Sequence, residues 1–433
     1  MIPEIEKRSK SEIKKFQEKE LRSLLKYLNK KSPFYQKWFK NHKINLSEIR
    51  TLEDLLKIPV TTKDELQKYN NDFFCVKTSK IVDYVTTSGT TGKPVFFGLT
   101  DKDLDRLAYN EAISFACSNV TENDVMQLMT TIDRRFMAGL AYFLGARKLS
   151  AGIIRVGAGI PELQWDSINK FNPTYLIAVP SFLLKLIEYA ENNDIDINKS
   201  SVKGAICIGE PLKNQDFSLN VLSEKIKSKW DIDLFSTYAS TEMGTAFAEC
   251  EYQQGGHHHP ELIIVEILDD NDDPVKEGEE GELVVTTLGV EAMPLLRFKT
   301  GDIVKAHNDS CKCGRNTLRL GPVVGRKKQM IKYKGTTIYP PAMHNLLNDF
   351  AEVENYIIEI DSNEIGTDKI TIKIGAHKVS LDLVEKLKDH FRAKLRVSAQ
   401  IEFVSVKEIN VLRFPKMSRK PLLFIDKRKK RIE

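Results

Sequence analysis

Between residues 100 and 240 the chain alternates short apolar runs with segments of helical spacing, and this alternation constrains the fold more than any other feature. Helices are expected over 104–117 and 180–192, where apolar residues recur at a period near 3.6. Strands are expected at the apolar runs 125–129, 152–156, 174–179, 204–208 and 232–235. Strands that alternate with helices form parallel sheets. The sequence therefore predicts a large α/β N-terminal domain with mixed sheets and covering helices.

The hydrophobic pattern of the chain differs on either side of this region. Residues 4–30 carry apolar side chains at helical spacing and predict one amphipathic opening helix. After residue 260, strand-like runs at 262–268 and 282–287 flank an acidic turn, which predicts a small antiparallel, barrel-like subdomain. Short elements at 357–360, 369–374, 383–395 and 401–406 predict a small α+β C-terminal domain. The expected domains are 1–325 and 326–433.

Composition excludes several classes of protein. Hydrophobic residues make up 41% of the 433, and no run approaches the roughly 18 apolar residues that a membrane span needs. The first residues turn charged at once, unlike a signal peptide, so a cytoplasmic location is expected. The net charge of +5 equals the charge of the basic tail 427–431, so no nucleic-acid partner is expected. The alternative, a nucleic-acid-binding protein, is supported by that basic tail alone.

A loop rich in hydroxyl groups follows the strand-like run 81–85. Residues 86–93 contain five hydroxyl side chains, two glycines and one lysine. Glycine lets backbone N–H groups approach an anion, while hydroxyl and ammonium groups donate to phosphate oxygens. The loop is not a Walker A motif, because its glycines are too close together and Pro94 follows Lys93. It predicts a phosphate clamp of another class, with a flexible Ser/Thr/Gly linker as the alternative.

This loop resembles the phosphate loop of the adenylate-forming superfamily, and the chain as a whole resembles the phenylacetate–CoA ligase family. The family's opening segment is matched by residues 32–35, 51–55 and 58–63, and later blocks follow in the family's order. The resemblance implies an enzyme that uses ATP, Mg²⁺ and coenzyme A. It also implies that the C-terminal domain is a mobile lid.

The resemblance also assigns nucleotide-binding residues. The clamp would comprise Thr87, Ser88, Gly89, Thr90, Thr91, Gly92 and Lys93, and the adenine side Gly209, Glu210 and Pro211. In the block Tyr238-Ala239-Ser240-Thr241-Glu242, Tyr238 would pack on adenine and Thr241 would contact the adenylate phosphate, with alanine in place of a family glycine. Glu242 would hold Mg²⁺, which prefers carboxylate and phosphate oxygens. Asp302 would bind ribose, and Arg326 ribose or phosphate. Read alone, each of these segments is an ordinary turn or cap.

Two further assignments concern the lid and the acyl group. Lys328 takes the hinge position, and Lys420 aligns with the lysine that bridges the acid and the α-phosphate. Arg419 stands where the family has glycine, and the alternative is that Lys420 is one more lysine of a basic tail. Phe136 and Gly139 lie where the family places acyl-pocket residues, although such a run is also typical of plain core.

Cys250, His257, Cys311 and Cys313 form a candidate zinc set. Three thiolates and one imidazole make a closed tetrahedral Cys₃His site, which is typical of structural Zn²⁺. His258 and His259 leave the identity of the histidine ligand open, and a disulfide is disfavoured in a cytoplasmic protein. Some members of the resembling family carry such a metal knuckle. The other cysteines, at positions 75, 117 and 207, are expected to be buried thiols.

The resemblance to the phenylacetate–CoA ligase family implies an ATP-dependent acid–thiol ligase. A carboxylic acid, with an aryl or arylacetic acid preferred, would react with ATP to give acyl-AMP and pyrophosphate, and coenzyme A would then displace AMP. A carrier-protein phosphopantetheine is the alternative acceptor, and a non-catalytic zinc-stabilised relative is the alternative class. The oligomeric state is open, with a homodimer one alternative.

Overall fold

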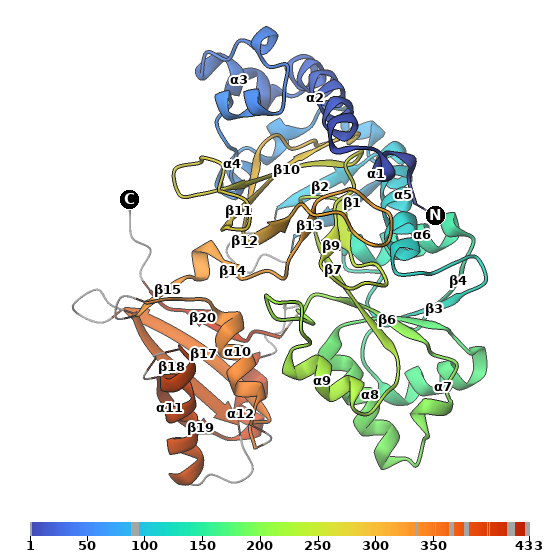
Figure 1. Cartoon of the computed structure of the whole chain (residues 1–433), viewed down its shortest axis with the longest axis vertical. Coiled ribbons are helices and arrows are strands. Elements are labelled where there is room, and N and C mark those ends of the chain that lie inside the picture. The colour runs from blue at the N-terminus through green and yellow to red at the C-terminus, as the bar shows by residue number, and fades with distance from the viewer. Residues whose placement is uncertain are drawn as a thin grey trace. The chain divides into compact units, whose positions relative to one another are not determined.

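A computed structural model of the chain describes residues 2–87, 95–333, 336–350, 352–362, 368–375, 381–395, 397, 399–413 and 421–428. The chain divides into two compact units (Figure 1). Unit 1 contains residues 1–300 and 304–323, and unit 2 contains residues 301–303 and 324–433. Each unit has its own hydrophobic core. Among the described residues, no helix is long and apolar enough to cross a membrane.

A parallel sheet lies at the centre of unit 1, as the alternation predicts. Its strands occur in the order β4 (Gly152–Arg155), β3 (Val125–Leu128), β5 (Tyr175–Ala178), β6 (Gly204–Ile208) and β7 (Asp233–Ser240). Neighbouring strands of this set are parallel. Strand β5 is buried along its whole length, as expected for a strand covered on both faces.

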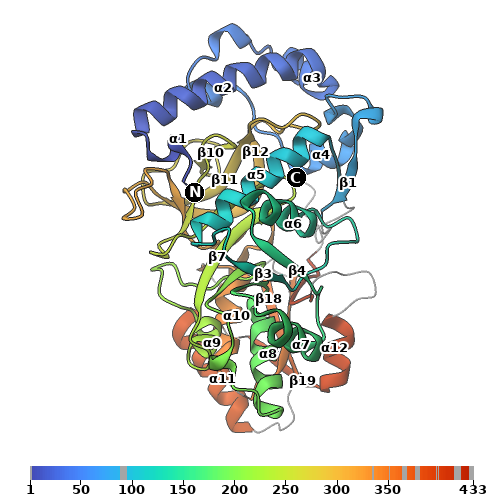
Figure 2. The same cartoon turned by 90° about the vertical axis from the view of Figure 1, so that its right-hand side faces the viewer.

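Helices cover both faces of this sheet. Leu176 and Ala178 of β5 pack against one group of helices: α7 (Pro161–Phe171), α8 (Pro180–Asn192) and α9 (Val221–Lys227). Tyr175 and Ile177 of the same strand point to the opposite face, which is covered by α5 (Asp101–Cys117) and α6 (Met137–Leu149). The alternation follows from the two-residue period of a strand. Helices α5 and α6 lie side by side (Figure 2).

The sheet continues from β7 into antiparallel strands. These are β8 (Thr245–Ala248), β9 (Gly256–His257), β13 (Arg319–Leu320), β12 (Phe298–His307), β11 (Glu280–Thr287) and β10 (Ile263–Leu268). Strands β10 and β11 are antiparallel across the acidic turn, as predicted. A separate hairpin pairs β1 (Asp83–Thr86) with β2 (Phe96–Leu99).

The N-terminal segment forms two helices rather than the single one predicted for 4–30. Helix α1 (Glu4–Lys7) ends before Ser9, and α2 (Lys10–Lys31) begins after it. Ser9 caps α2, and its side chain and that of Glu12 form a reciprocal capping box. The Ser-x-x-Glu spacing is a helix-start signal that apolar periodicity does not detect. Helix α3 (Pro33–Asn41) follows, and α4 (Lys63–Lys68) precedes β1.

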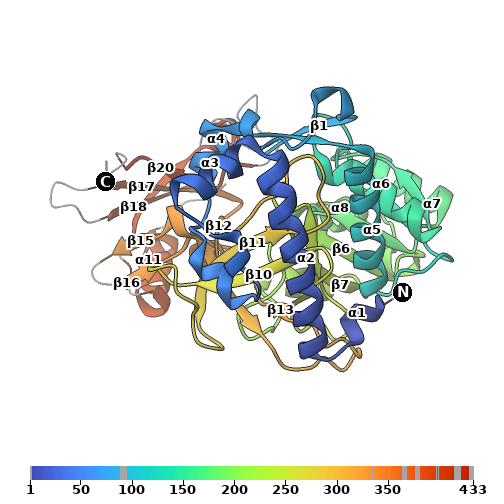
Figure 3. The same ribbon diagram turned by 90° about the horizontal axis from the view of Figure 1, so that it is seen from above.

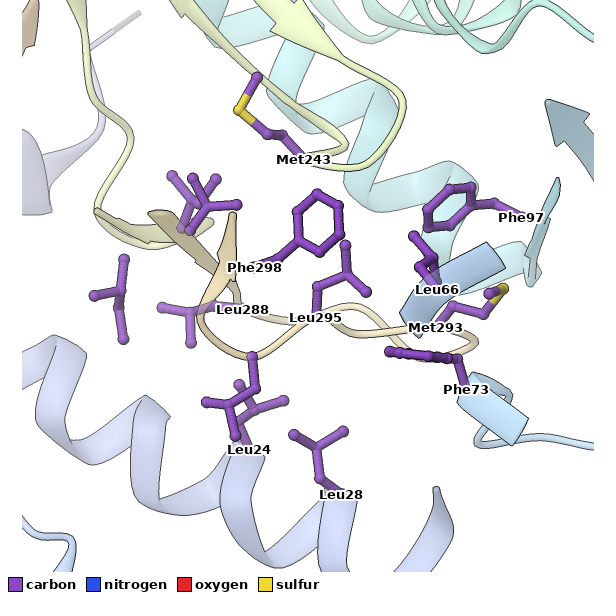
Figure 4. Packing of buried hydrophobic residues seen from close by; sticks show 14 of the residues in the cluster. Leu24, Leu28, Leu66, Phe73, Phe97, Met243, Leu288, Met293, Leu295 and Phe298 are labelled. Atoms are coloured by element: carbon purple, nitrogen blue, oxygen red, sulfur yellow. The ribbon is translucent and has the colours of Figure 1, made fainter. Parts of the chain in front are cut away.

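Helix α2 lies across strands β10 and β11 (Figure 3). Its Leu24 and Leu28 point toward Leu288 and Leu295 in a cluster that also contains Phe298 (Figure 4). Burying a leucine side chain stabilises a fold by roughly 1.5–3 kcal/mol. The N-terminal helices are therefore an integral part of the unit 1 core.

Unit 2 contains a sheet in the order β19 (Gln400–Val404), β18 (Asp368–Gly375), β17 (Asn355–Ser362) and β20 (Phe424–Asp426). Ile370, Ile372 and Ile374 of β18 pack against α10 (Pro340–Asn348) and α11 (Leu381–Leu395). Gly375 faces the other side, where Ile409 of α12 (Val406–Arg413) approaches it. The hairpin β15 (Ile331–Tyr333) and β16 (Thr336–Ile338) precedes α10. This is the predicted small α+β arrangement.

A buried carboxyl group lies between α5 and α6. A Cβ atom on Gly145 of α6 would lie 2.2 Å from the Cβ of Glu111 on α5, so the two helices approach closely at this point. Glu111 is 6% exposed, and burial raises its pKa to about 8. The native state therefore keeps the Glu111 proton through a pH range in which the unfolded chain loses it.

Replacing Glu111 by glutamine is expected to remove a pH-dependent loss of stability. Between pH 4.5, the ordinary glutamate value, and pH 8, the unfolded state binds fewer protons than the native state. The free energy of unfolding of the wild-type protein therefore falls by about 1.4 kcal/mol for each pH unit in this range, because of the Glu111 carboxyl group. Urea unfolding of both proteins at pH 5, 6.5 and 8 measures the effect. Parallel pH profiles for the two proteins would contradict it.

Candidate functional site

The described part of the predicted phosphate clamp is Thr87, which directly follows β1 of the β1–β2 hairpin. Thr87 is buried, its hydroxyl accepts a hydrogen bond from Val95 N at 3.1 Å, and its own N–H donates to Val95 O. These two bonds bring together the ends of the loop that holds Ser88–Lys93. Ser88, Gly89, Thr90, Thr91, Gly92 and Lys93 themselves lie outside the described residues.

The loop between β3 and α6 lies beside this hairpin. Thr86 N donates to Arg135 O at 3.0 Å. Arg134 and Arg135 both adopt the left-handed region, with φ of 57° and 58°, which is rare for residues with a Cβ atom. Strained backbone of this kind occurs often at ligand-binding sites. Among the described residues, neither guanidinium has a hydrogen bond or an ion pair. Sequence reasoning missed this pair, although it directly precedes Phe136.

The predicted acyl-pocket residues lie where this loop enters α6. Phe136 is the N-cap of α6, and Gly139 is in its first turn. A Cβ atom at Gly139 would lie 2.1 Å from Thr131 O and 2.7 Å from Ile132 Cα. Glycine is therefore required here because the loop packs directly on the helix. The contact explains Gly139 by close packing.

The adenine-side segment follows β6, at the carboxyl end of the parallel sheet. Gly209 has φ of 77°, a conformation that glycine adopts without strain. The two carboxylate oxygens of Glu210 accept from Ser181 N and Ser181 Oγ, each at 2.9 Å. An acidic group at the start of α8 also complements the helix dipole. Pro211 O accepts from Asn220 Nδ2 at 2.8 Å, which fixes the end of the segment.

The block at 238–242 is a hairpin rather than a loop after a short strand. The sequence predicts a strand that ends at Phe235. Strand β7 instead continues to Ser240. Tyr238, Ala239 and Ser240 pair with Phe247, Ala246 and Thr245 of β8, and this ladder extends the strand beyond its apolar part. Thr241 and Glu242 then occupy the turn, where Ser240 Oγ accepts from Met243 N.

Glu242 is held by an ion pair that sequence reasoning missed. Lys63 Nζ lies 3.1 Å from Glu242 Oε1, and the two side chains are 26% and 12% exposed. Lys63 is the first residue of α4, and its capping residue is Thr62. The signal was present in the family-like segment 58–63, but that segment had no assigned role. The lysine and the carboxylate form a polar pair beside the turn.

Asp302 and Arg326 lie together in unit 2. Asp302 lies within the continuous strand β12, residues 298–307, and not in the ordinary turn that its segment indicates when read alone. Asp302 pairs with Arg326 of β14 (Gly325–Arg326), and Arg326 Nε lies 3.4 Å from Asp302 Oδ1. Lys328 lies in the short 3-10 helix that follows, Lys327–Gln329. Arg419 and Lys420 are outside the described residues.

Cys250, His257, Cys311 and Cys313 come together in unit 1. One ligand atom from each lies within 4.8 Å of all the others. Cys250 Sγ is 3.7 Å from Cys311 Sγ, and Cys313 Sγ is 3.5 Å from His257 Nε2. The hydrogen bond between Cys250 and Cys313 lowers the pKa of the Cys313 thiol and raises the pKa of the Cys250 thiol, so the two sulfurs share one proton.

The structure distinguishes the three consecutive histidines. His257 Nδ1 lies 3.2 Å from Thr317 Oγ1, which orients its ring with Nε2 in the cluster. His258 Nε2 donates to Ile263 O, and His259 Nδ1 contacts Glu6. Cys75, Cys117 and Cys207 are buried free thiols, as predicted. Three sulfurs and one imidazole nitrogen match the donor set of a structural zinc site.

Comparison with known proteins places the chain in a family. The family profile described as AMP-binding enzyme matches residues 36–292. This chain belongs to the AMP-binding enzyme family. It is 30% identical over 381 residues to the phenylacetate-coenzyme A ligase of Thermus thermophilus, covering 86% of this chain and 83% of that protein. The Escherichia coli phenylacetate-coenzyme A ligase is 28% identical, with coverage of 88% and 86%.

Solved structures of CoA ligases share the fold. A crystal structure of 2-hydroxyisobutyryl-CoA ligase in the postadenylation state superposes with a TM-score of 0.84 at 22% identity. The match covers 98% of this chain and 91% of that one. The predicted α/β domain followed by a smaller α+β domain is thus the architecture of acyl-CoA ligases.

Proposed function

We propose that this protein is an ATP-dependent, AMP-forming carboxylate–CoA ligase. The observation that carries the proposal is its similarity to phenylacetate–CoA ligases over more than four-fifths of both chains. In the first half-reaction the acid attacks the α-phosphate of Mg·ATP, which gives acyl-AMP and pyrophosphate. In the second, the thiol of coenzyme A attacks the acyl carbon and AMP leaves.

The residues of unit 1 hold the nucleotide and its metal ion. The clamp that begins at Thr87 binds the triphosphate, and the segments at 209–211 and 238–240 line the adenine. Thr241 contacts the adenylate phosphate, and Glu242 binds Mg²⁺. Because Lys63 is paired with Glu242, its ammonium group is available to a phosphate oxygen once Mg²⁺ takes the carboxylate. In this arrangement the Glu242 carboxylate binds the metal ion, and the Lys63 ammonium group binds a phosphate oxygen.

Residues of unit 2 are assigned to ribose binding, to the hinge and to the α-phosphate. Asp302 accepts the ribose hydroxyls, and Arg326, already beside it, binds ribose or phosphate. Lys328 is the hinge between domains 1–325 and 326–433, and Lys420 from the lid stabilises the charge that develops on the α-phosphate. A short segment that absorbs backbone rotation is sufficient for such a hinge. Its lysine, where the family has aspartate, changes the charge but not this capacity.

Zinc at Cys250, His257, Cys311 and Cys313 is proposed as a structural ion. All four coordination positions are filled by protein atoms, so no position is open for a substrate. Zinc here joins the segment between β8 and β9 to the loop before β13. It supplies stability and takes no part in acyl transfer.

Carboxylate-dependent ATP–pyrophosphate exchange tests the proposed function. The panel contains aryl, arylacetic and short aliphatic acids, together with acids that carry a second anionic group, because Arg134 and Arg135 precede Phe136. We expect exchange with one group of acids and none without acid, with aryl or arylacetic acids preferred. Glu242→Gln is expected to lower the rate at least tenfold because it weakens Mg²⁺ binding. ATP binding without exchange for any acid would contradict the proposal.

The acceptor is tested separately. Thioester formation is measured with coenzyme A and with a phosphopantetheine-bearing carrier protein, each at equal concentration. Coenzyme A is expected to be the better acceptor. Faster transfer to the carrier would replace this part of the proposal and leave the adenylation step intact.

A further inference from the structure

A glutamate near the N-terminus is completely buried. Glu6 lies on α1 and is 0% exposed. Burying a carboxylate is costly unless it is paired and hydrogen-bonded. Both of its oxygens are paired: Oε1 lies 2.5 Å from His259 Nδ1, and Oε2 lies 2.8 Å from Arg315 Nε. The partners are more than 250 residues away in the sequence, so the pair joins distant segments.

Arg315 connects this carboxylate to the cysteine–histidine cluster. Its Nη1 lies 3.5 Å from Cys313 Sγ, and its side chain is 2% exposed. Three thiolates, one neutral imidazole and one divalent ion carry a formal charge of −1. The buried guanidinium therefore lies between two negative groups, the metal cluster and Glu6. Each of them offsets the cost of burying the arginine.

Hydrogen bonds from the backbone and side chain of Asn316 join α1 to the same loop. Asn316 N donates to Glu6 O at 2.8 Å, and Asn316 Nδ2 donates to Lys7 O and Arg8 O at 3.0 and 3.3 Å. A helix of four residues is not stable by itself in water. The position of α1 therefore depends on the loop 311–316, which carries two of the three cluster cysteines.

We propose that Arg315 and Glu6 are positioning residues of the metal centre, and that metal binding holds α1 against the rest of unit 1. The inference rests on the proposed zinc site and extends it to the N-terminal segment. Arg315 donates to the Cys313 thiolate, and Glu6 fixes the orientation of Arg315. Groups that support metal ligands in this way change metal affinity by about 10–100-fold when they are replaced. By linkage, the metal strengthens the docking of α1 by the same factor.

The first test compares Glu6→Gln with Glu4→Gln. Glu4 lies on the same helix but its side chain is 78% exposed, so it serves as the matched control. Zinc affinity of the full-length proteins is measured by competition with a chromogenic chelator, with circular dichroism to verify folding. We expect about 10–100-fold weaker zinc binding for Glu6→Gln and no change for Glu4→Gln. Arg315→Lys keeps the charge but loses the fork of donors, and is expected to weaken zinc binding as well.

The second test measures the docking of α1. Trypsin cleavage after Lys7 and Arg8 is followed by mass spectrometry in zinc-loaded and chelator-treated wild type. We expect removal of zinc to accelerate this cleavage at least tenfold, and Glu6→Gln to be cleaved rapidly in both states. Unchanged zinc affinity in Glu6→Gln, or cleavage independent of zinc, overturns this inference while the zinc site remains. Wild type that binds no zinc overturns the zinc site itself.

Discussion

Replacement of Lys420 by alanine is expected to abolish carboxylate-dependent ATP–pyrophosphate exchange and to spare thioester formation from supplied acyl-adenylate. In the proposed mechanism its ammonium group neutralises charge that develops between the acid and the α-phosphate. Removing one such preorganised donor typically lowers the rate 10²–10³-fold. The second half-reaction starts from acyl-AMP and does not pass through that transition state. The two half-reactions are measured separately, with purified acyl-adenylate in the second.

Lys416→Ala is the matched control, because Lys416 belongs to the same basic segment. It is expected to retain exchange. If Lys420→Ala loses both half-reactions equally, its assigned role is wrong and a structural role is indicated. If both variants retain exchange, the lysine that bridges acid and phosphate lies elsewhere. Arg419→Gly in the wild-type background then measures the effect of the residue that departs from the family pattern.

The central sheet and its covering helices could be predicted because their information is local. Helix 180–192 and strand 204–208 have the predicted bounds, since their apolar periods match their environments closely. The break at Ser9 was missed because helical periodicity continues across it, while the capping box that starts α2 depends on two polar side chains. Periodicity thus identifies which segments are regular and leaves their ends to local polar contacts.

Strand β7 and Asp302 illustrate a second limit. Tyr238–Ser240 have no apolar alternation, yet they are extended because β8 supplies partners for their backbone groups. Asp302 is likewise in a strand because β14 pairs with β12. Such pairing depends on residues that are not adjacent in sequence, so composition alone reads both segments as turns.

In the candidate site, the sequence likewise indicated individual residues but not the contacts between distant residues. A family motif indicated Glu242, and the donor types of Cys250, His257, Cys311 and Cys313 indicated the metal cluster. They did not indicate Lys63 beside Glu242 or Glu6 beside Arg315, because each pair joins residues 179 or more positions apart. No local pattern specifies the partner of a buried charge. The tertiary fold supplies it.

Replacement of Cys313 by serine is expected to remove the bound metal and to destabilise unit 1. A serine hydroxyl is a poor zinc ligand because it is not ionised at neutral pH, so the tetrahedral set becomes incomplete. Zinc at a thousandfold excess over its Kd stabilises a native protein by about 4 kcal/mol, and that contribution is lost. Zinc content is measured by elemental analysis, and stability by urea unfolding in the presence and absence of chelator.

Cys75→Ser is the control, since Cys75 is also a buried thiol but lies in the apolar core away from the cluster. It is expected to keep the metal and to remain sensitive to the chelator. Chelator should destabilise wild type and Cys75→Ser but not Cys313→Ser, because the variant has no metal to lose. Equal destabilisation of all three proteins by the chelator would mean that its effect does not act through this cluster. Wild type without zinc, purified in the absence of chelator, would exclude the metal centre, and Arg315 would then be paired with a thiolate rather than with a metal cluster.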